Sequence, residues 1–301
     1  MLEVEYYRQM AEGCLHRPIA GVAVPDPHCL LGPESPDALD AQLAGGWFET
    51  ARRRGKLLLL DTAGPDGPGA RHPAGGQGAL RSGGRGARHP AGGAQRAAGA
   101  DTRRPGLTLG VRFGMTGSLV LDDRTAFDRL LYSPPVIDPK WIRLRIGFVD
   151  GGHLALHDPR RLGRVVVDPD EATLGPDAFG VSLGALRQAL SSRRGAGPPL
   201  KVRLQDQARL AGIGNLLADE ILWRAGLSPT RPSASLSALE LRRLHRQLGR
   251  TLDDLLGRGG SHTGDLMEQR RAGGLCPQDG APLERSRVGG RTTWWCPAHQ
   301  R

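Results

Sequence analysis

A change in the spacing of apolar residues at Pro198-Pro199 constrains the fold more than any other feature of this chain. Before it, segments such as 107–121 alternate apolar and polar residues, which is typical of half-buried strands. After it, residues 200–258 have the pattern of amphipathic helices. Strands followed by helices, rather than strands alternating with helices, predict an α+β fold.

The N-terminal half is expected to be a β-sandwich that begins with a helix. Residues 4–16 carry apolar side chains at helical spacing, and residues 19–61 alternate short apolar runs with Pro and Gly, as strands and turns do. Strands resume at residue 107, and the turn signals between them favour an antiparallel sandwich or barrel.

Residues 63–106 interrupt this pattern. They are mostly Gly, Ala, Pro and Arg, and the heptapeptide Ala-Arg-His-Pro-Ala-Gly-Gly occurs at 70–76 and again at 87–93. Two copies are too few for a solenoid, and the segment lacks side chains that could fill a core. We therefore predict a disordered insertion in a surface loop, and interpret His72 and His89 as linker residues rather than metal ligands.

Composition excludes collagen-like, acidic and wholly disordered chains. The 301 residues carry a net charge of +10, and no apolar stretch reaches the roughly 18 residues of a membrane span. With acids and no apolar run near Met1, we expect a cytoplasmic protein with an anionic partner. Bulk basicity is weak support, because only three of the 41 basic residues are lysines and the insertion alone contributes +5.

The tail contains a candidate metal site. Cys276 and Asp279 form a C-x2-D pair, and after sixteen intervening residues Cys296 and His299 form a C-x2-H pair. Two close ligand pairs joined by a hairpin suit tetrahedral zinc, and a hairpin this small needs such a staple. The alternative is two packed thiols beside a plain Asp279-Gly280 turn.

Three further motifs are weak when taken singly: Gly114-Met115-Thr116-Gly117-Ser118, the Asp158–Gly163 segment DPRRLG, and Gly212-Ile213-Gly214-Asn215. Each has an ordinary structural interpretation as a turn. A glycine-rich turn before a helix can also bind phosphate through free N–H groups.

Taken in chain order, these segments resemble the formamidopyrimidine-DNA glycosylase / endonuclease VIII family of base-excision repair enzymes. The strongest similarity is at 201–229, which resembles the family's helix-two-turn-helix core, followed by the tail sequence GGRTTWWCPAHQ. Weaker similarities are at 3–5, 52–56, 114–119 and 158–163. The resemblance implies a sandwich domain at 1–180, a helix-two-turn-helix domain at 181–260 and a zinc-finger hairpin at 261–301.

It also implies double-stranded DNA with damaged bases or abasic sites as the partner, one structural Zn²⁺, a monomer and a nucleoid location. Flipping a base leaves a gap in the stack that side chains must fill. By motif match, Met115 fills the gap, Arg160 faces the orphaned base, and Leu162 stands where the family often has Phe as a wedge. The predicted phosphate-binding residues are Lys56, Lys201, Asn215 and Arg291, of which Lys56 and Arg291 belong to the catalytic site.

The family's catalytic start has no counterpart in this chain. The family begins M-P-E-L-P-E-V-E, with the Pro as nucleophile and the next Glu as acid, whereas this chain begins M-L-E-V-E. Three interpretations follow: the natural protein has three more residues and is a glycosylase with abasic-site lyase activity; the chain binds lesions without cutting; or the Met1 amine replaces the Pro. Glu3 and Glu5 are interpreted as acids favoured at a helix N-terminus.

Lesion preference cannot be predicted from these residues. Residues 183–199 are the only candidate for a loop that contacts the lesion. An RNA-binding helical module is a remoter alternative, disfavoured because the sandwich half and the tail match the family together.

Overall fold

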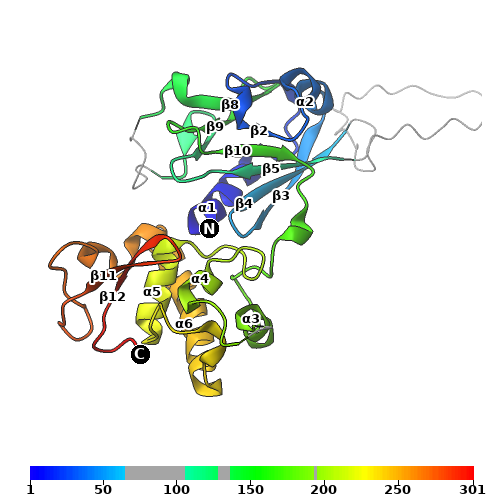
Figure 1. Ribbon diagram of the computed structural model, residues 1–301. Coiled ribbons are helices and arrows are strands. Elements are labelled where there is room, and N and C mark those ends of the chain that lie inside the picture. The colour runs from blue at the N-terminus through cyan, green and yellow to red at the C-terminus, as the bar shows by residue number, and fades with distance from the viewer. Residues whose placement is uncertain (65–105, 128–135, 193–194) are drawn as a thin grey trace, which may run out of the picture.

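The computed structural model describes residues 1–64, 106–127, 136–192 and 195–301 (Figure 1). Apart from its first two residues and its last, the predicted disordered insertion at 63–106 lies outside this part of the chain. The described residues form an upper layer of strands and a lower layer of helices with a hairpin beside them (Figure 1). The predicted α+β class, with strands preceding helices, is confirmed.

Two five-stranded sheets make up the sandwich. They have the orders β1-β8-β9-β6-β7 and β2-β10-β5-β4-β3, and of the pairs within them only β2–β10 is parallel among the described residues. The first sheet comprises β1 (Ile19–Ala23), β8 (Ile142–Phe148), β9 (His153–His157), β6 (Ser118–Leu121) and β7 (Arg124–Thr125). The second comprises β2 (Leu30–Leu31), β10 (Arg164–Val167), β5 (Thr108–Arg112), β4 (Leu57–Ala63) and β3 (Trp47–Arg54).

The predicted N-terminal helix is α1 (Leu2–Ala11), followed by a 3-10 turn at Glu12–Cys14. Val4 and Tyr7 of α1 join the sandwich core, whereas Met1 and Leu2 belong to the core of the helical domain. The N-terminus therefore lies at the junction of the two domains, as Figure 1 shows.

A second helix, α2 (Pro36–Leu43), corrects the prediction of strands and turns throughout 19–61. The Ser35 hydroxyl accepts from Ala38 N at 3.1 Å, Pro36 occupies the first turn, and Leu39 and Leu43 are buried. A capping Ser followed by Pro is the local signal that the strand interpretation missed.

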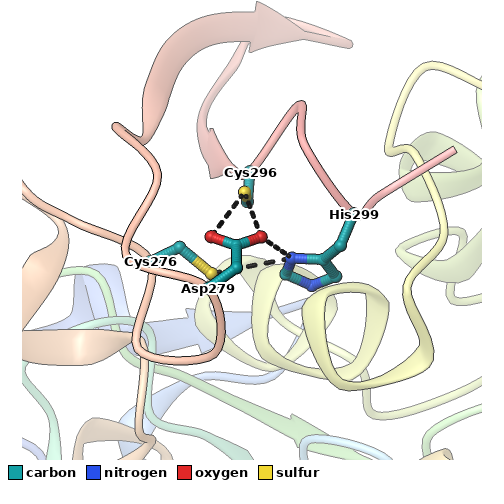
Figure 2. Close-up of side chains that lie close together, drawn as sticks. All are labelled: Cys276, Asp279, Cys296 and His299. Carbon is teal, nitrogen blue, oxygen red and sulfur yellow. Dashed lines mark hydrogen bonds and ion pairs between the residues drawn. The ribbon is translucent and has the colours of Figure 1, made fainter.

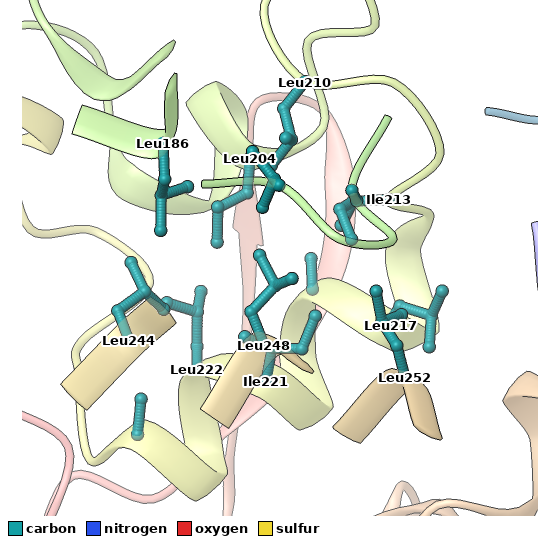
Figure 3. Packing of buried hydrophobic residues seen from close by; sticks show 14 of the residues in the cluster. Leu186, Leu204, Leu210, Ile213, Leu217, Ile221, Leu222, Leu244, Leu248 and Leu252 are labelled. Atoms are coloured by element: carbon teal, nitrogen blue, oxygen red, sulfur yellow. The ribbon is translucent and has the colours of Figure 1, made fainter. Parts of the chain in front are cut away.

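The helical domain consists of α3 (Leu183–Leu190), α4 (Leu200–Leu204), α5 (Asn215–Ala225) and α6 (Ala238–Gly257). Figure 3 shows its core, in which leucines of α3, α5 and α6 meet around Leu204 and Ile213. The predicted capping box of Ser237 and Glu240 is confirmed at the start of α6. Because α3 occupies Leu183–Leu190, the segment 183–199 is not the continuous loop that was expected.

The tail forms the hairpin of β11 (Glu284–Val288) and β12 (Arg291–Trp295), which lies beside α5 (Figure 1). Its own core is small: Trp223 of α5 packs with Leu266, Leu283 and Trp294 and with the two cysteines. None of the described helices is long and apolar enough to cross a membrane.

Candidate functional site

Two neighbouring turns of the sandwich are joined by the buried carboxylate of Asp158. Its Oδ1 accepts hydrogen bonds from Thr116 Oγ1 at 2.6 Å and from Arg160 N at 3.2 Å, and its Oδ2 accepts from Gly163 N at 2.5 Å. Asp158 is fully buried, so water does not compete for these contacts. The side chain therefore fixes the Met115 turn against the Arg160–Leu162 turn.

The contact between these two turns brings the predicted wedge residues together at the surface. A Cβ on Gly114, whose φ is +63°, would lie 2.7 Å from Leu162 Cβ, so the turns approach closely because residue 114 is glycine. Met115 and Leu162 are large apolar side chains left 53% and 41% exposed. The exposed guanidinium of Arg160 has no polar partner within the described residues.

Lys56 lies where the sandwich meets the helical domain. Asp177 Oδ2 accepts from Gly55 N at 2.6 Å and from Arg53 Nη1 at 2.7 Å, which holds the β3–β4 turn in place. A Cβ on Gly55 would lie 2.9 Å from Ala211 Cβ, so this turn rests directly on the glycine-rich segment before α5. Lys56 Nζ donates to the carbonyl of Ile213 at 2.9 Å.

The charge of Lys56 is only partly compensated. Partial desolvation of the ammonium, and then the positive charge of Arg291, lower the pKa of Lys56 to about 8, against a smaller opposing effect of Glu3. Arg291 is exposed at the start of β12. Two cations are thus held near each other at the domain junction, an arrangement that a bound anion would stabilise.

Lys201 and Asn215 both contact strand β12. The Lys201 side chain is fully enclosed, with Nζ 2.7 Å from Asp219 Oδ1, and is not presented on a surface as the predicted phosphate contact requires. Asn215, at the start of α5, donates from Nδ2 to the Thr292 carbonyl at 3.0 Å.

The four predicted metal ligands converge in the tail (Figure 2). One donor atom from each of Cys276, Asp279, Cys296 and His299 lies within 4.8 Å of the other three. His299 Nδ1 is 2.9 Å from Asp279 Oδ2, and Cys296 Sγ is 3.3 Å from the same oxygen. The Ala281 N–H and then the His299 ring hold the pKa of the Asp279 carboxyl well below its usual range, so the carboxylate is available as a ligand.

Contacts outside this cluster orient two of its members. His299 Nε2 is 3.2 Å from the Trp223 carbonyl, which fixes Nε2 as the protonated nitrogen and leaves Nδ1 facing the cluster. The Trp223 indole donates to Cys276 Sγ at 3.3 Å. The donor set and its outer contacts therefore fit a four-coordinate metal ion.

The amino group of Met1 lies close to the junction between the sandwich and the helical domain. It is 3.4 Å from Glu3 Oε2, and burial lowers the pKa of the amine. Glu3 Oε1 in turn accepts from Ser261 Oγ at 2.5 Å and from Ser261 N at 2.8 Å. The adjacent amine and then the Ser261 hydroxyl hold the pKa of Glu3 at about 2 despite burial. Glu3 therefore joins α1 to the segment after α6, in addition to its predicted place as an acid at a helix N-terminus.

Sequence reasoning missed the acids that organise the site. Asp158 lies inside a quoted motif, but its spacing predicts neither its burial nor its partners. Asp177 and Asp219 have no local signal, because Arg53 and Arg270 lie far from them in sequence.

Comparisons with known proteins place the chain in a family. The model of the formamidopyrimidine-DNA glycosylase N-terminal domain matches residues 1–165, and that of the formamidopyrimidine-DNA glycosylase H2TH domain matches 174–266. This chain belongs to the formamidopyrimidine-DNA glycosylase family. The resemblance found in the sequence is thereby confirmed.

Similar proteins extend over nearly the whole chain. The formamidopyrimidine-DNA glycosylase of Laribacter hongkongensis is 33% identical over 311 residues, covering 95% of this chain and 93% of that protein. That of Chloroflexus aurantiacus is 27% identical over 97% of this chain and 94% of that protein. A Lactococcus lactis Fpg structure with abasic-site DNA has the same fold, with a TM-score of 0.71 and 22% identity over 100% of this chain and 99% of that one.

Proposed function

We propose that this protein binds double-stranded DNA at a damaged base or an abasic site and flips the affected nucleotide out of the helix. The observation that carries the proposal is the pair of exposed apolar side chains, Met115 and Leu162, beside Arg160, whose guanidinium has no polar partner in the described part of the chain. A flipped nucleotide leaves an apolar gap and an orphaned base, and these side chains supply two fillers and one hydrogen-bond donor.

The phosphates would be bound at the domain junction. Lys56 has three protons and one acceptor among the described residues, the Ile213 carbonyl, so it can donate further. Arg291 adds a second uncompensated cation nearby. The Lactococcus lactis relatives were solved with FAPY-dG and abasic-site DNA, which supports the same class of partner here.

The proposed chemistry is removal of the damaged base followed by strand cleavage at the abasic site. In the family the N-terminal Pro attacks C1′, and its secondary amine gives an iminium that favours β-elimination. We propose that the activity depends on a Pro-Glu pair ahead of Glu3-Val4-Glu5, and that without it the chain binds lesions but does not cut. The Met1 amine, enclosed beside Glu3, is the remaining candidate nucleophile.

We further propose that the metal is a structural Zn²⁺ and that the protein acts as a monomer in the nucleoid. Two cysteine sulfurs, one imidazole and one carboxylate are donors suited to zinc. Zinc would join the Cys276–Asp279 turn to the end of β12, and so stabilise the hairpin that carries Arg291.

Borohydride trapping tests the proposed chemistry. This chain and a version extended by Met-Pro-Glu are each incubated with abasic-site DNA and borohydride, and parallel samples contain a tetrahydrofuran analogue that binds but cannot form an imine. We expect crosslinks from the extended chain on abasic DNA alone. If both chains bind and neither crosslinks, the protein is a lesion binder and not an enzyme.

A crosslink from the chain as given that persists in Lys56→Arg would instead favour the Met1 amine as nucleophile. If neither chain prefers lesion DNA to undamaged duplex, the proposed function fails as a whole.

A further inference from the structure

The ammonium of Lys201 is enclosed by oxygen atoms of the protein. Nζ lies 2.7 Å from Asp219 Oδ1, 2.8 Å from Thr293 Oγ1 and 3.1 Å from the Thr292 carbonyl. Nζ donates hydrogen bonds to the two threonine oxygens and is ion-paired with Asp219, so the charge is already compensated within the protein. The side chains of Lys201 and Asp219 are both fully buried.

Asp219 holds the other end of the same network. Its Oδ2 accepts from Arg270 Nη1 at 2.5 Å and from Trp294 N at 3.3 Å. Asp219 lies within α5, Lys201 within α4, and Trp294 within β12. One buried carboxylate therefore connects two helices of the helical domain to the hairpin.

These contacts fall on consecutive residues of β12. The Thr292 carbonyl accepts from Lys201 and also from Asn215, the Thr293 hydroxyl accepts from Lys201, and the Trp294 amide donates to Asp219. Arg291 is the next residue along the strand. Its backbone is thus anchored on one side by groups that solvent does not reach.

We propose that Lys201 and Asp219 are positioning residues that hold strand β12 so that Arg291 faces the phosphate beside Lys56, and that Lys201 does not itself contact DNA. This inference rests on the proposed DNA binding for its consequence, but not for the anchoring. The buried pair costs desolvation, and removing one partner leaves the other charge uncompensated. Because both residues contact β12, we expect the removal of either one to disturb the hairpin before the rest of the domain.

A double-mutant cycle separates positioning from direct contact. The variants are Lys201→Met, Arg291→Ala and the double change, each tested for binding to tetrahydrofuran-containing duplex over a series of salt concentrations. The measured quantity is the salt slope, that is, the steepness with which the logarithm of the binding constant falls as the logarithm of the salt concentration rises. If Lys201 acts through Arg291, each single change lowers the salt slope by about 1, and the double change lowers it no further. If Lys201 contacts a phosphate directly, the double change lowers the slope by about 2 and the losses in affinity multiply.

Hydrogen exchange of the free protein tests the anchoring without DNA. We expect faster exchange of the amides at 291–295 in Lys201→Met and in the milder Asp219→Asn, which retains a side-chain acceptor for Trp294 N. Lys140→Met is the matched control, because Lys140 is an exposed lysine whose ion pair with Asp138 lies on the sandwich.

Unchanged exchange in both variants would overturn the proposal, as would a salt slope that falls by about 2 in the double variant. If the protein does not bind lesion DNA but both variants show faster exchange, the proposed function is refuted and the proposed anchoring of β12 is retained.

Discussion

Replacing Asp158 is expected to disorganise the proposed wedge more than any other single change in the sandwich. The carboxylate accepts from Thr116 Oγ1, Arg160 N and Gly163 N, and so joins the two turns that carry Met115 and Leu162. Alanine removes all three contacts, whereas asparagine keeps the shape of the side chain. The pair of variants therefore separates the loss of volume from the loss of charge.

The magnitude follows from the burial of these contacts. In Asp158→Asn one oxygen can still accept from Thr116 and Arg160, but the amide nitrogen faces the buried Gly163 N–H, a mismatch that costs about 1–3 kcal/mol. In Asp158→Ala two buried donors and the partly buried Arg160 N–H lose a charged acceptor, and we expect a loss of about 3–5 kcal/mol. Thr116→Val, which removes one hydroxyl contact, should cost about 1 kcal/mol.

Urea unfolding followed by circular dichroism measures the stability loss, and titration of tetrahydrofuran-containing duplex measures binding. We expect the affinity of Asp158→Asn to fall about tenfold, equivalent to 1.4 kcal/mol, because the wedge turns lose their fixed relation. In Asp158→Ala, Thr116→Val should cost less than it does alone, since the Thr116 hydroxyl has already lost its acceptor. Additive effects, or an Asp158→Ala variant that unfolds and binds like the parent, would refute this reasoning.

Three further changes test the rest of the site. Freshly purified protein should contain about one equivalent of zinc by metal analysis, and Asp279→Ala should lower it; less than about half an equivalent in the parent contradicts the zinc assignment. Because the pKa of Lys56 is about 8, affinity for tetrahydrofuran-containing duplex should fall from pH 7 to pH 9 as the ammonium loses its proton, whereas Lys56→Arg stays charged and should show a flatter profile; equal profiles would exclude Lys56 as the titrating group. Met115→Ala should weaken binding to lesion duplex by about 1–2 kcal/mol with little effect on undamaged duplex, and equal losses on both would assign Met115 to general DNA contact instead of gap filling.

The parts of the fold predicted from sequence are those with local causes. The capping box at Ser237 depends on residues three apart, and the metal cluster depends on two pairs that are each three residues apart. A hairpin then needs only to bring one pair to the other. Helix α2 shows where local patterns fail to predict an element. It has only two buried leucines in eight residues, and this short pattern does not outweigh the Pro and Gly around it.

The contacts that organise the site depend on tertiary structure and were not predictable. Asp177 lies 124 residues from Arg53, and Asp219 lies 51 residues from Arg270. No pattern along the chain distinguishes these acids from the solvated majority. Their roles come from burial, because a carboxylate removed from water must gather donors wherever the fold supplies them.

The two lysines matched to the family's phosphate-binding residues show how tertiary surroundings separate two residues that the sequence treats alike. Lys56 donates to one acceptor among the described residues and has a lowered pKa beside another cation, so an anion would stabilise it. Lys201 is fully buried, donates to two threonine oxygens and is ion-paired with Asp219, so a phosphate would have to displace protein groups to reach it. The match to the family is the same for both, and the different surroundings of the two ammonium groups are the reason why we propose a DNA contact for Lys56 and a contact with the hairpin that presents Arg291 for Lys201.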